Sequence, residues 1–125
     1  MATKKCTIFC DIDGTLLKYR NFADYKSTKS EIISTTVSCI NESYENGQCI
    51  VLTTARPEYL RIHTMKELDE TNIKYHQLVM GIERGSRILI NDKEKEKDRA
   101  YAFNVSRNTG MTNTQLDEFV KILQK

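Results

Sequence analysis

The sequence contains no tryptophan, a single proline, only two histidines and no excess of charge of either sign. Its 19 basic and 17 acidic side chains leave a net charge of +2, too small for the broad positive surface that binds nucleic acids or anionic membranes. No run approaches the roughly 20 apolar residues of a transmembrane helix. Repeats, low-complexity tracts and linkers are also absent. These absences exclude a membrane-spanning protein and do not favour a nucleic-acid-binding one.

The four cysteines show no metal-binding pattern. Cys6, Cys10, Cys39 and Cys49 form no C-x-x-C pair and have no neighbouring histidine motif. We interpret them as small buried hydrophobic residues. The first five residues lead into an apolar stretch without the apolar region of a signal peptide. We therefore expect a cytoplasmic protein that does not associate with membranes.

A chain of 125 residues has the usual length of one domain, so we expect a single domain over residues 1–125. Short apolar runs alternate with stretches of helical spacing. This alternation implies an α/β protein with a doubly wound, mostly parallel sheet. Strands are expected at residues 7–10, 49–52, 75–80 and 88–90, with a further edge strand at 100–105.

Three helices have readable ends. A Thr-x-x-Glu pattern at residues 28–31 is a capping box before a helix that Gly47 can close. Pro57 opens a second helix, through about residue 72. A Thr-x-x-Gln pattern at 112–115 caps the last one. The expected apolar faces are Ile33, Val37, Ile40 and Tyr44 in the first, Tyr59, Ile62, Met65 and Leu68 in the second, and Leu116, Phe119, Val120 and Leu123 in the last.

The most informative stretch ends an apolar run with two carboxylates. Residues 7–10 form a short uninterrupted apolar run, which is typical of a strand buried on both faces of a parallel sheet. Asp11 and Asp13 follow directly, and ligands of such sheets bind at the carboxyl ends of strands. Gly14 lets the backbone turn tightly after the second acid and is a candidate substrate contact. An ordinary turn is the alternative, because Asp and Gly are favoured in turns.

The run Asp11-Ile12-Asp13-Gly14-Thr15-Leu16 resembles the first signature of the haloacid dehalogenase superfamily, most of whose members are Mg²⁺-dependent phosphatases. The resemblance implies a Rossmann-like three-layer α/β sandwich. It also implies that Asp11 is the nucleophile and a Mg²⁺ ligand. Asp13 would be the general acid and base, and its backbone carbonyl would also bind the metal. A carboxylate that attacks a phosphoryl group forms an acyl-phosphate, and Mg²⁺ compensates the charge of the two approaching anions.

The second expected strand ends in Thr53-Thr54-Ala55-Arg56-Pro57. The family's second signature is a Ser or Thr after a hydrophobic strand, often in a T-G-R-P context. Thr54 is the best match, and its hydroxyl would hydrogen-bond a phosphate oxygen. Thr53 remains an alternative, and Thr53 and Arg56 are candidate substrate contacts. Ala55 stands where that subgroup often has Gly, and Thr54 can also be read as a helix N-cap before Pro57.

The strand expected at 88–90 ends in Asn91-Asp92-Lys93 and looks like the fourth signature, whose acid completes the Mg²⁺ shell. Asp92 is therefore the candidate third ligand. Many members carry two acids at this point, and here Asn91 replaces the first of them. An amide oxygen can still orient a metal-bound water.

The third signature calls for a Lys or Arg upstream of the last strand, where the cation stabilises charge on the transferring phosphoryl oxygens. Arg84, in a glycine-flanked loop, is the preferred candidate for this catalytic role. Arg87 and Lys93 are alternatives and candidate contacts of the substrate phosphate. The charged run at residues 93–99 alternates in sign, so we interpret it as a solvated loop or short helix without function.

No segment is long enough for a cap domain of the kind that many family members insert. Residues 18–48 are mostly used by one crossover helix, and residues 55–87 by one helix and one strand. A capless site leaves a small substrate exposed to water, which weakens the electrostatics of phosphoryl transfer. We therefore expect a homo-oligomer in which a neighbouring subunit closes the site. The alternative is a monomer that acts on a bulky substrate, such as a nucleic-acid end, which supplies its own wall.

The sequence thus predicts a Mg²⁺-dependent phosphomonoester hydrolase that acts through an aspartyl-phosphate. The context of residues 54–57 and 90–92 resembles small bacterial or phage proteins of capsule and sugar-phosphate metabolism, so a sugar phosphate or similar small metabolite is the expected substrate. A polynucleotide 3'-phosphatase is the alternative enzyme, which the near-neutral charge does not favour. A non-catalytic phosphate-binding or signalling module is the third reading. In receiver domains the acid pair and the phosphorylated Asp lie on different strands, whereas here both acids follow one strand.

Overall fold

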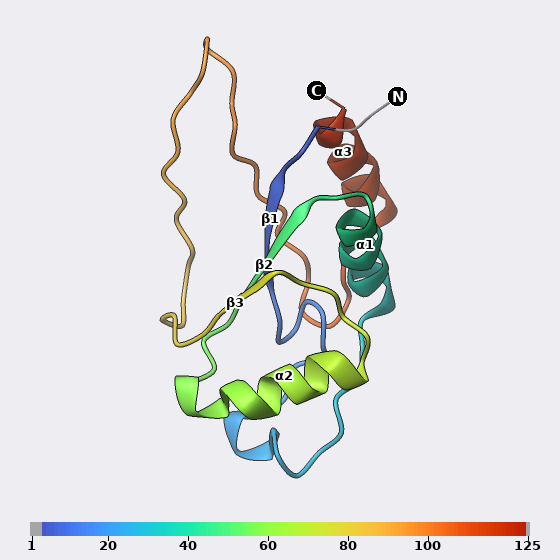
Figure 1. Cartoon of the computed structure of the whole chain (residues 1–125), viewed down its shortest axis with the longest axis vertical. Coiled ribbons are helices and arrows are strands. Elements are labelled where there is room, and N and C mark those ends of the chain that lie inside the picture. Colours follow the sequence, from blue (N-terminus) through green and yellow to red (C-terminus); the bar gives the residue numbers. More distant parts are fainter. Residues whose placement is uncertain (1–3, 125) are drawn as a thin grey trace.

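A three-stranded parallel sheet forms the centre of the computed structural model, which describes residues 4–124 (Figure 1). The strands lie in the order β1 (Thr7–Asp11), β2 (Cys49–Thr53) and β3 (Gln77–Val79). The crossovers contain the helices α1 (Ser34–Glu45) and α2 (Arg61–Glu70), and α3 (Asn113–Leu123) ends the described chain. Short 3₁₀ helices lie at η1 (Phe22–Asp24) and η2 (Glu58–Leu60). The expected α/β class with a Rossmann-like parallel sheet is confirmed.

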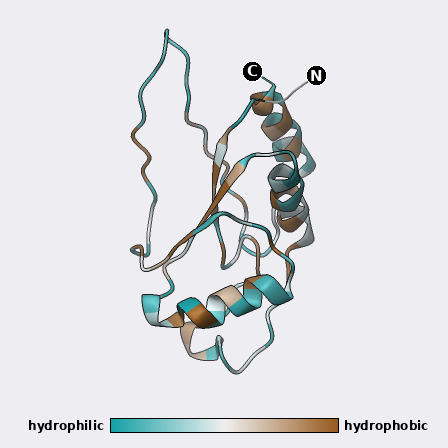
Figure 2. Ribbon diagram, in the orientation of Figure 1, coloured by the Kyte–Doolittle hydropathy of each residue, from teal (hydrophilic) through white to brown (hydrophobic). Residues whose placement is uncertain are grey.

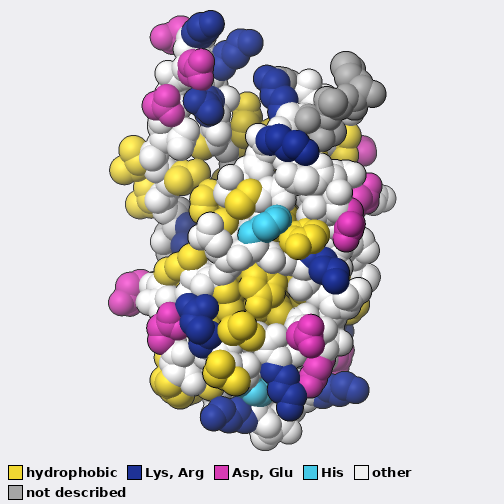
Figure 3. All heavy atoms as spheres, viewed as in Figure 1, with side chains coloured by type: hydrophobic (Ala, Val, Ile, Leu, Met, Phe, Trp, Pro, Cys, Tyr) yellow, Lys and Arg dark blue, Asp and Glu magenta, His cyan; other side chains and the backbone are white. Residues whose placement is uncertain are grey.

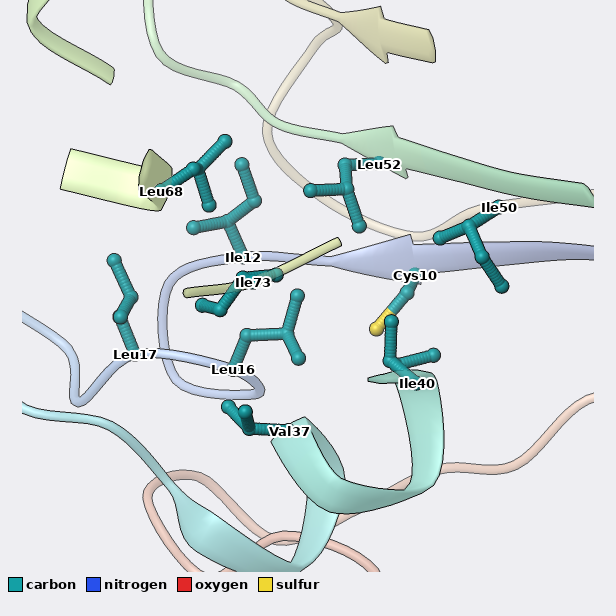
Figure 4. Packing of buried hydrophobic residues seen from close by; sticks show 10 residues of the cluster. All are labelled: Cys10, Ile12, Leu16, Leu17, Val37, Ile40, Ile50, Leu52, Leu68 and Ile73. Carbon is teal, nitrogen blue, oxygen red and sulfur yellow. The ribbon is translucent and has the colours of Figure 1, made fainter. Parts of the chain in front are cut away.

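The core lies between the sheet and the first two helices (Figure 4). Successive residues of a strand point to opposite faces, and alternate apolar residues of β1 and β2 point to the same side. They pack with residues of α1 and of α2, so both helices cover this face. The cluster consists of Cys10, Ile12, Leu16, Leu17, Val37, Ile40, Ile50, Leu52, Leu68 and Ile73. The strands are correspondingly among the most hydrophobic parts of the ribbon in Figure 2. Each fully buried Leu or Ile contributes roughly 1.5–3 kcal/mol.

The opposite face of the sheet is partly open to solvent. Phe9 on β1 is 61% exposed and Val79 on β3 is 40% exposed, whereas Val51 on the central strand is buried. Hydrophobic side chains also gather on the surface in the middle of the view of Figure 3. None of the helices within residues 4–124 is long and apolar enough to cross a membrane.

All four cysteines are free thiols, and two of them are buried as expected, whereas Cys6 and Cys49 are only half-buried. Cys10 and Cys39 are buried, and burial is the main reason why the pKa of each thiol is raised above its usual value. Neither is therefore a reactive thiolate.

The first helix begins later than its expected cap. The capping box at residues 28–31 is not formed, because the Thr28 hydroxyl donates back to the Asp24 carbonyl over 2.7 Å and Ile33 is the N-cap. The Ile33 N–H donates to the Leu16 carbonyl, which ties this segment to the turn after β1. Residues 18–33 are consequently mostly a loop rather than part of the crossover helix. The expected apolar face of α1 and its end at Gly47, which has a φ of +88°, are confirmed.

The capping box of the last helix is present. The Gln115 N–H donates to the Thr112 hydroxyl over 3.2 Å, and the Thr112 N–H donates to the Gln115 side chain over 3.0 Å. On its expected face, Leu123 is buried and Val120 is 49% exposed.

The buried face of the second helix differs from the expected one. Tyr59 and Ile62 are 71% and 78% exposed, and of the expected residues only Leu68 is fully buried. The face turned inward instead carries Thr64 and Glu67, which are buried polar residues. The spacing of apolar residues does not predict the buried face of α2, because hydrogen bonds rather than apolar packing hold this side of the helix.

A long loop joins β3 to α3, and the strands expected at 88–90 and 100–105 are not formed in it. Ile88 and Ile90 are 86% and 91% exposed, so nothing covers the side chains that the apolar run was expected to bury. The loop turns at a bridge between Glu94 and Lys97. In Figure 1 this tip lies beyond the ends at which the strands begin. The charged run at its tip is solvated, as expected.

Candidate active site

The two acids of the first strand lie at the carboxyl end of β1. Asp11 is its last residue, and Ile12, which follows, is fully buried in the core. The chain then turns at Gly14, whose φ is +88° and whose N–H donates to the Leu17 carbonyl over 2.7 Å. Any residue other than glycine would be strained at this φ. The turn therefore presents Asp11 and Asp13 on either side of a residue anchored in the core, and the N–H of Gly14 is not available to a substrate.

Asp11 is a half-buried carboxylate without a cationic side chain of its own. Its Oδ2 accepts a hydrogen bond from the Thr15 hydroxyl at 3.1 Å. Within residues 4–124 it forms no ion pair. Burial is the main cause that raises the pKa of Asp11, and the charge of Asp13 adds to it. The Thr15 hydrogen bond and the charge of Arg87 partly offset both.

Asp13, in contrast, is held by three hydrogen bonds. Arg56 donates from Nε to Oδ2 over 2.9 Å and from Nη2 to Oδ1 over 2.8 Å. The Tyr25 hydroxyl donates to Oδ2 over 3.2 Å. Burial, and then the charge of Asp13, raise the pKa of Tyr25 to about 12, so this hydroxyl keeps its proton. The two neighbouring acids therefore have different surroundings, which is how one site assigns them different roles.

The two threonines after β2 differ in accessibility. Thr53 pairs with Asp11 in the register of the sheet and is half-buried. Thr54 is 2% exposed, and its hydroxyl accepts the N–H of Arg56 at 3.1 Å. This bond lies within the loop after β2, so Thr54 is not the helix N-cap of the alternative interpretation: Pro57 and Leu60 are the N-caps of the two helices that follow. Thr53 lies beside Asp11.

Arg56 was expected to contact the substrate, but it is 2% exposed. Besides Asp13, its guanidinium contacts Thr64 and Glu67. A side chain whose donors all point to buried protein groups has none left for a phosphate.

The three cations considered for phosphate binding all lie in the long loop. Arg84, Arg87 and Lys93 are exposed. Lys93 pairs with Asp98 over 3.6 Å, and Arg87 donates to the carbonyls of Glu83 and Gly85. Arg87 is the one of the three whose charge lowers the pKa of Asp11. It is therefore the loop cation with an electrostatic link to Asp11.

The structure does not bring Asp92 to the other two acids. Asp92 is exposed in the loop, where its carboxylate accepts from the side chain of Asn91 at 3.4 Å. In the described part of the chain no three His, Cys, Asp or Glu side chains form a group that could hold a metal ion. The reason is local, because the strand that would carry Asp92 to the sheet edge is not formed.

Asp11 and the backbone carbonyl of Asp13 nevertheless fit Mg²⁺. Both are hard oxygen donors, and Mg²⁺ is usually bound by one or two carboxylates, the substrate phosphate and several waters. The half-buried charge of Asp11, which no cationic side chain pairs, is the feature that a divalent cation would stabilise. The carboxylate of Asp13 does not have this freedom, because Arg56 occupies it.

Sequence reasoning missed several residues of this site. Tyr25 comes from the loop that follows the catalytic turn, and Glu67 and Arg20 form the ion pair behind Arg56. Arg107 also lies at the turn: its guanidinium stacks over the Tyr19 ring at 4.0 Å. None of these belongs to a motif, and a charged residue that is buried only through its partners leaves no pattern in one sequence.

Comparisons with known proteins agree with this geometry. A profile of the haloacid dehalogenase-like hydrolases matches residues 8–125. No curated protein matches the chain.

Three solved structures are similar in fold. A chain in the structure of a Pnkp1/Rnl/Hen1 complex shares 20% identity at a TM-score of 0.54, over 68% of this chain and 31% of that one. A chain in the structure of the Pnkp1/Rnl/Hen1 RNA repair complex shares 20% identity at 0.52, over 98% of this chain and 33% of that one. A target protein from Vibrio cholerae shares 16% identity at 0.51, over 92% and 96% of the two chains. This chain therefore spans about a third of the Pnkp1/Rnl/Hen1 chains. At such identities the likeness concerns the fold.

Proposed function

We propose that this chain, which belongs to the haloacid dehalogenase-like hydrolases, is a phosphatase that cleaves phosphate monoesters through Asp11. Family membership supports a hydrolase. The observation that carries the narrower proposal is the asymmetry of the two acids at the end of β1. Asp11 is without an ion pair in residues 4–124, as a nucleophile must be, while Asp13 is fixed by Arg56 and Tyr25. We take residues 1–125 to be one catalytic domain without a cap.

The reaction proceeds in two balanced steps. An oxygen of Asp11 attacks phosphorus, the bond from phosphorus to the leaving oxygen breaks, and Asp13, which enters this step as the neutral carboxylic acid, gives that oxygen its proton and becomes a carboxylate. Water then attacks phosphorus, the bond to Asp11 breaks, and Asp13 takes the proton from the water. Phosphate leaves and both acids return to their starting states. Bound Mg²⁺ would offset the charge of the two anions that meet in the first step.

Asp11 and the Asp13 carbonyl would hold the metal, and we propose Asp92 as its third protein ligand. This requires residues 88–92 to lie along the edge of β1 instead of in the exposed loop. That edge offers a place for them, because β1 is the end strand of the sheet and pairs with β2. The apolar side chains of Ile88 and Ile90, now exposed, would gain cover there.

If Asp92 binds the metal, Asp92→Ala should raise the Mg²⁺ concentration needed both for activity and for thermal stabilisation. A ligand that binds only the folded state raises the unfolding temperature once its concentration exceeds its dissociation constant. We expect a shift of about tenfold or more in the Mg²⁺ midpoint, from the typical loss of one charged contact. Chelation should abolish activity reversibly.

Asp98→Ala is the matched control, because Asp98 lies in the same loop and pairs with Lys93. It should leave both Mg²⁺ midpoints unchanged. Equal midpoints for Asp92→Ala and the wild type would show that Asp92 is not a ligand.

A sugar phosphate or a similar small polar metabolite is the proposed substrate. A pocket of about 410 Å³ lies beside the catalytic turn and is lined by polar and charged side chains, among them Tyr19, Arg20 and Asn108. Asn108 connects this pocket to the site, because its N–H donates to the Gly14 carbonyl over 2.8 Å. A pocket of this size suits a small ligand, and its hydrophilic lining suits hydroxyl groups.

A 3'-phosphorylated polynucleotide end is the second candidate. It is favoured by the fold similarity to chains of the Pnkp1/Rnl/Hen1 RNA repair complex. One phosphatase screen with Mg²⁺ tests the proposal: sugar phosphates, nucleotides and 3'-phosphorylated DNA or RNA are offered in parallel. Hydrolysis of sugar phosphates alone supports the first candidate, and hydrolysis of polynucleotide ends the second. Release of phosphate from none of them would leave a non-catalytic binding module.

We further propose a homo-oligomer located in the cytoplasm. The exposed apolar side chains of Phe9 and Val79 provide surface that a neighbouring subunit can cover. Sedimentation at micromolar concentration should give a dimer or tetramer, and Phe9→Glu should shift it toward the monomer. A strict monomer that still prefers small sugar phosphates would show this to be wrong.

A further inference from the structure

Arg56 is the most completely engaged charged side chain of the site. Its side chain is 1% exposed, and all three guanidinium nitrogens donate to buried or half-buried groups. Nε and Nη2 form the two parallel bonds to Asp13, and Nη1 donates to the Thr64 hydroxyl over 3.0 Å and to Glu67 over 2.7 Å. Its guanidinium also lies 4.2 Å from the centre of the Tyr25 ring. A planar fork of this kind fixes a carboxylate in one orientation, which a lysine cannot do.

The far side of Arg56 is anchored by a second ion pair. Glu67 accepts from Arg56 at one oxygen and from Arg20 at the other, over 2.6 Å. Arg20 in turn donates to the carbonyls of Tyr25 and Thr28. The charges of Asp13, Arg56, Glu67 and Arg20 thus alternate and cancel. Burial alone lowers the pKa of Arg56, but Asp13 and Glu67 outweigh it and raise that pKa above its usual value.

The two parallel hydrogen bonds from Arg56 to Asp13, which we call the clamp, leave few acceptor positions of the Asp13 carboxylate free. A carboxylate offers about four acceptor positions on its two oxygens. Oδ2 accepts from Arg56 Nε and from Tyr25, and Oδ1 accepts from Arg56 Nη2. The remaining acceptor position is on Oδ1. Any proton that Asp13 gives or takes must therefore be bound at this free position on Oδ1.

We propose that Arg56 is a positioning residue for proton transfer at Asp13: the Glu67-anchored guanidinium holds the Asp13 carboxyl group so that Oδ1 exchanges the proton with the leaving oxygen and then with water. This role rests on the proposed phosphatase function. It differs from phosphate binding, because Arg56 never touches the substrate. Its loss should therefore lower kcat and leave KM nearly unchanged.

The test compares Arg56→Lys with the wild type on two substrates, the best alkyl phosphate of the screen and p-nitrophenyl phosphate. An alkoxide needs a proton to leave, whereas nitrophenolate leaves without one. We expect kcat on the alkyl phosphate to fall by about 30- to 100-fold, from the usual contribution of a well-placed general acid. In single-turnover phosphorylation with the aryl phosphate the loss should be under about fivefold. KM should stay within about twofold on both.

Arg61→Lys is the matched control, since Arg61 is the first residue of α2, is partly exposed and pairs with Glu58 outside the site. It should change neither rate. Arg56→Ala adds a second readout: guanidinium ion at tens of millimolar should restore at least about fivefold of the lost kcat, and NaCl at equal ionic strength should not. If Arg56→Ala does not fold, the test relies on the kinetics of Arg56→Lys and Glu67→Gln.

Equal losses of kcat on the two substrates would mean that Arg56 is merely structural, and a several-fold rise in KM would mean that it binds phosphate. Either result overturns the proposal.

An NMR measurement separates this failure from that of the proposed function. The Nε–H signal of Arg56 should exchange slowly with solvent in the wild type and rapidly in Asp13→Ala. A rapidly exchanging signal in the wild type overturns the clamp whether or not the enzyme is active. A slow signal in a wild type that cleaves nothing overturns the phosphatase function, and the proton-transfer role with it.

Discussion

Asp11→Asn should reduce turnover at least about a thousandfold, which corresponds to a barrier roughly 4 kcal/mol higher. An amide oxygen is a poor nucleophile, so the covalent step cannot take place, while substrate binding at the neighbouring residues remains. The substitution should leave the fold intact, since an Asn side chain can still accept the hydrogen bond of Thr15. It also removes a charge whose burial raises the pKa of Asp11. The variant should therefore be at least as stable as the wild type in thermal unfolding without metal.

The measurement is steady-state phosphate release, together with trapping of the phosphorylated enzyme in acid. The wild type should yield a labelled protein and Asp11→Asn should not. Asp69→Asn is the control, because Asp69 is an exposed acid on α2. Appreciable activity of Asp11→Asn, after mass spectrometry has excluded deamidation, would remove Asp11 from the mechanism.

The sequence predicts the part of the fold that is encoded locally. The strand before Asp11 is a continuous apolar run, and the cap of α3 is a four-residue pattern whose reciprocal bonds form as expected. The position of Asp11 and Asp13 follows from the same reasoning, because the carboxyl edge of a parallel strand is determined once the strand is known.

What the sequence does not predict depends on partners far along the chain. Arg56 resembles a substrate contact in its motif, but Glu67, eleven residues away, and Asp13, 43 residues away, bury it. The face of α2 was misjudged for the same reason, since Glu67 is turned inward by two arginines. The apolar run at residues 88–90 has the composition of a strand, yet a strand needs a neighbour to pair with, and in this structure the chain there stays in the loop.

Glu67→Leu should lower the free energy of unfolding by about 3–5 kcal/mol, the usual cost of removing one partner from a buried ion pair. Leucine is of similar size and leaves no large cavity, so the loss comes from charge. Without Glu67, Arg20 has no ion-pair partner within residues 4–124, and its side chain is only 10% exposed. Arg56 keeps Asp13 but loses its anchor. Urea unfolding measures the change, and an unchanged slope would show that the denatured state is not altered.

Two further variants test whether the loss of stability comes from the buried ion pair. Glu70→Leu removes an acid of the same helix that is exposed and pairs with Lys66 over 3.9 Å, and it should change stability by less than about 0.5 kcal/mol. The double variant Arg20→Leu with Glu67→Leu removes both charges of the outer pair, so it should lose clearly less than the sum of the single variants. A loss below about 1 kcal/mol for Glu67→Leu would mean that water already screens this pair. In that case Arg56 would lack the rigid support that the positioning of Asp13 requires.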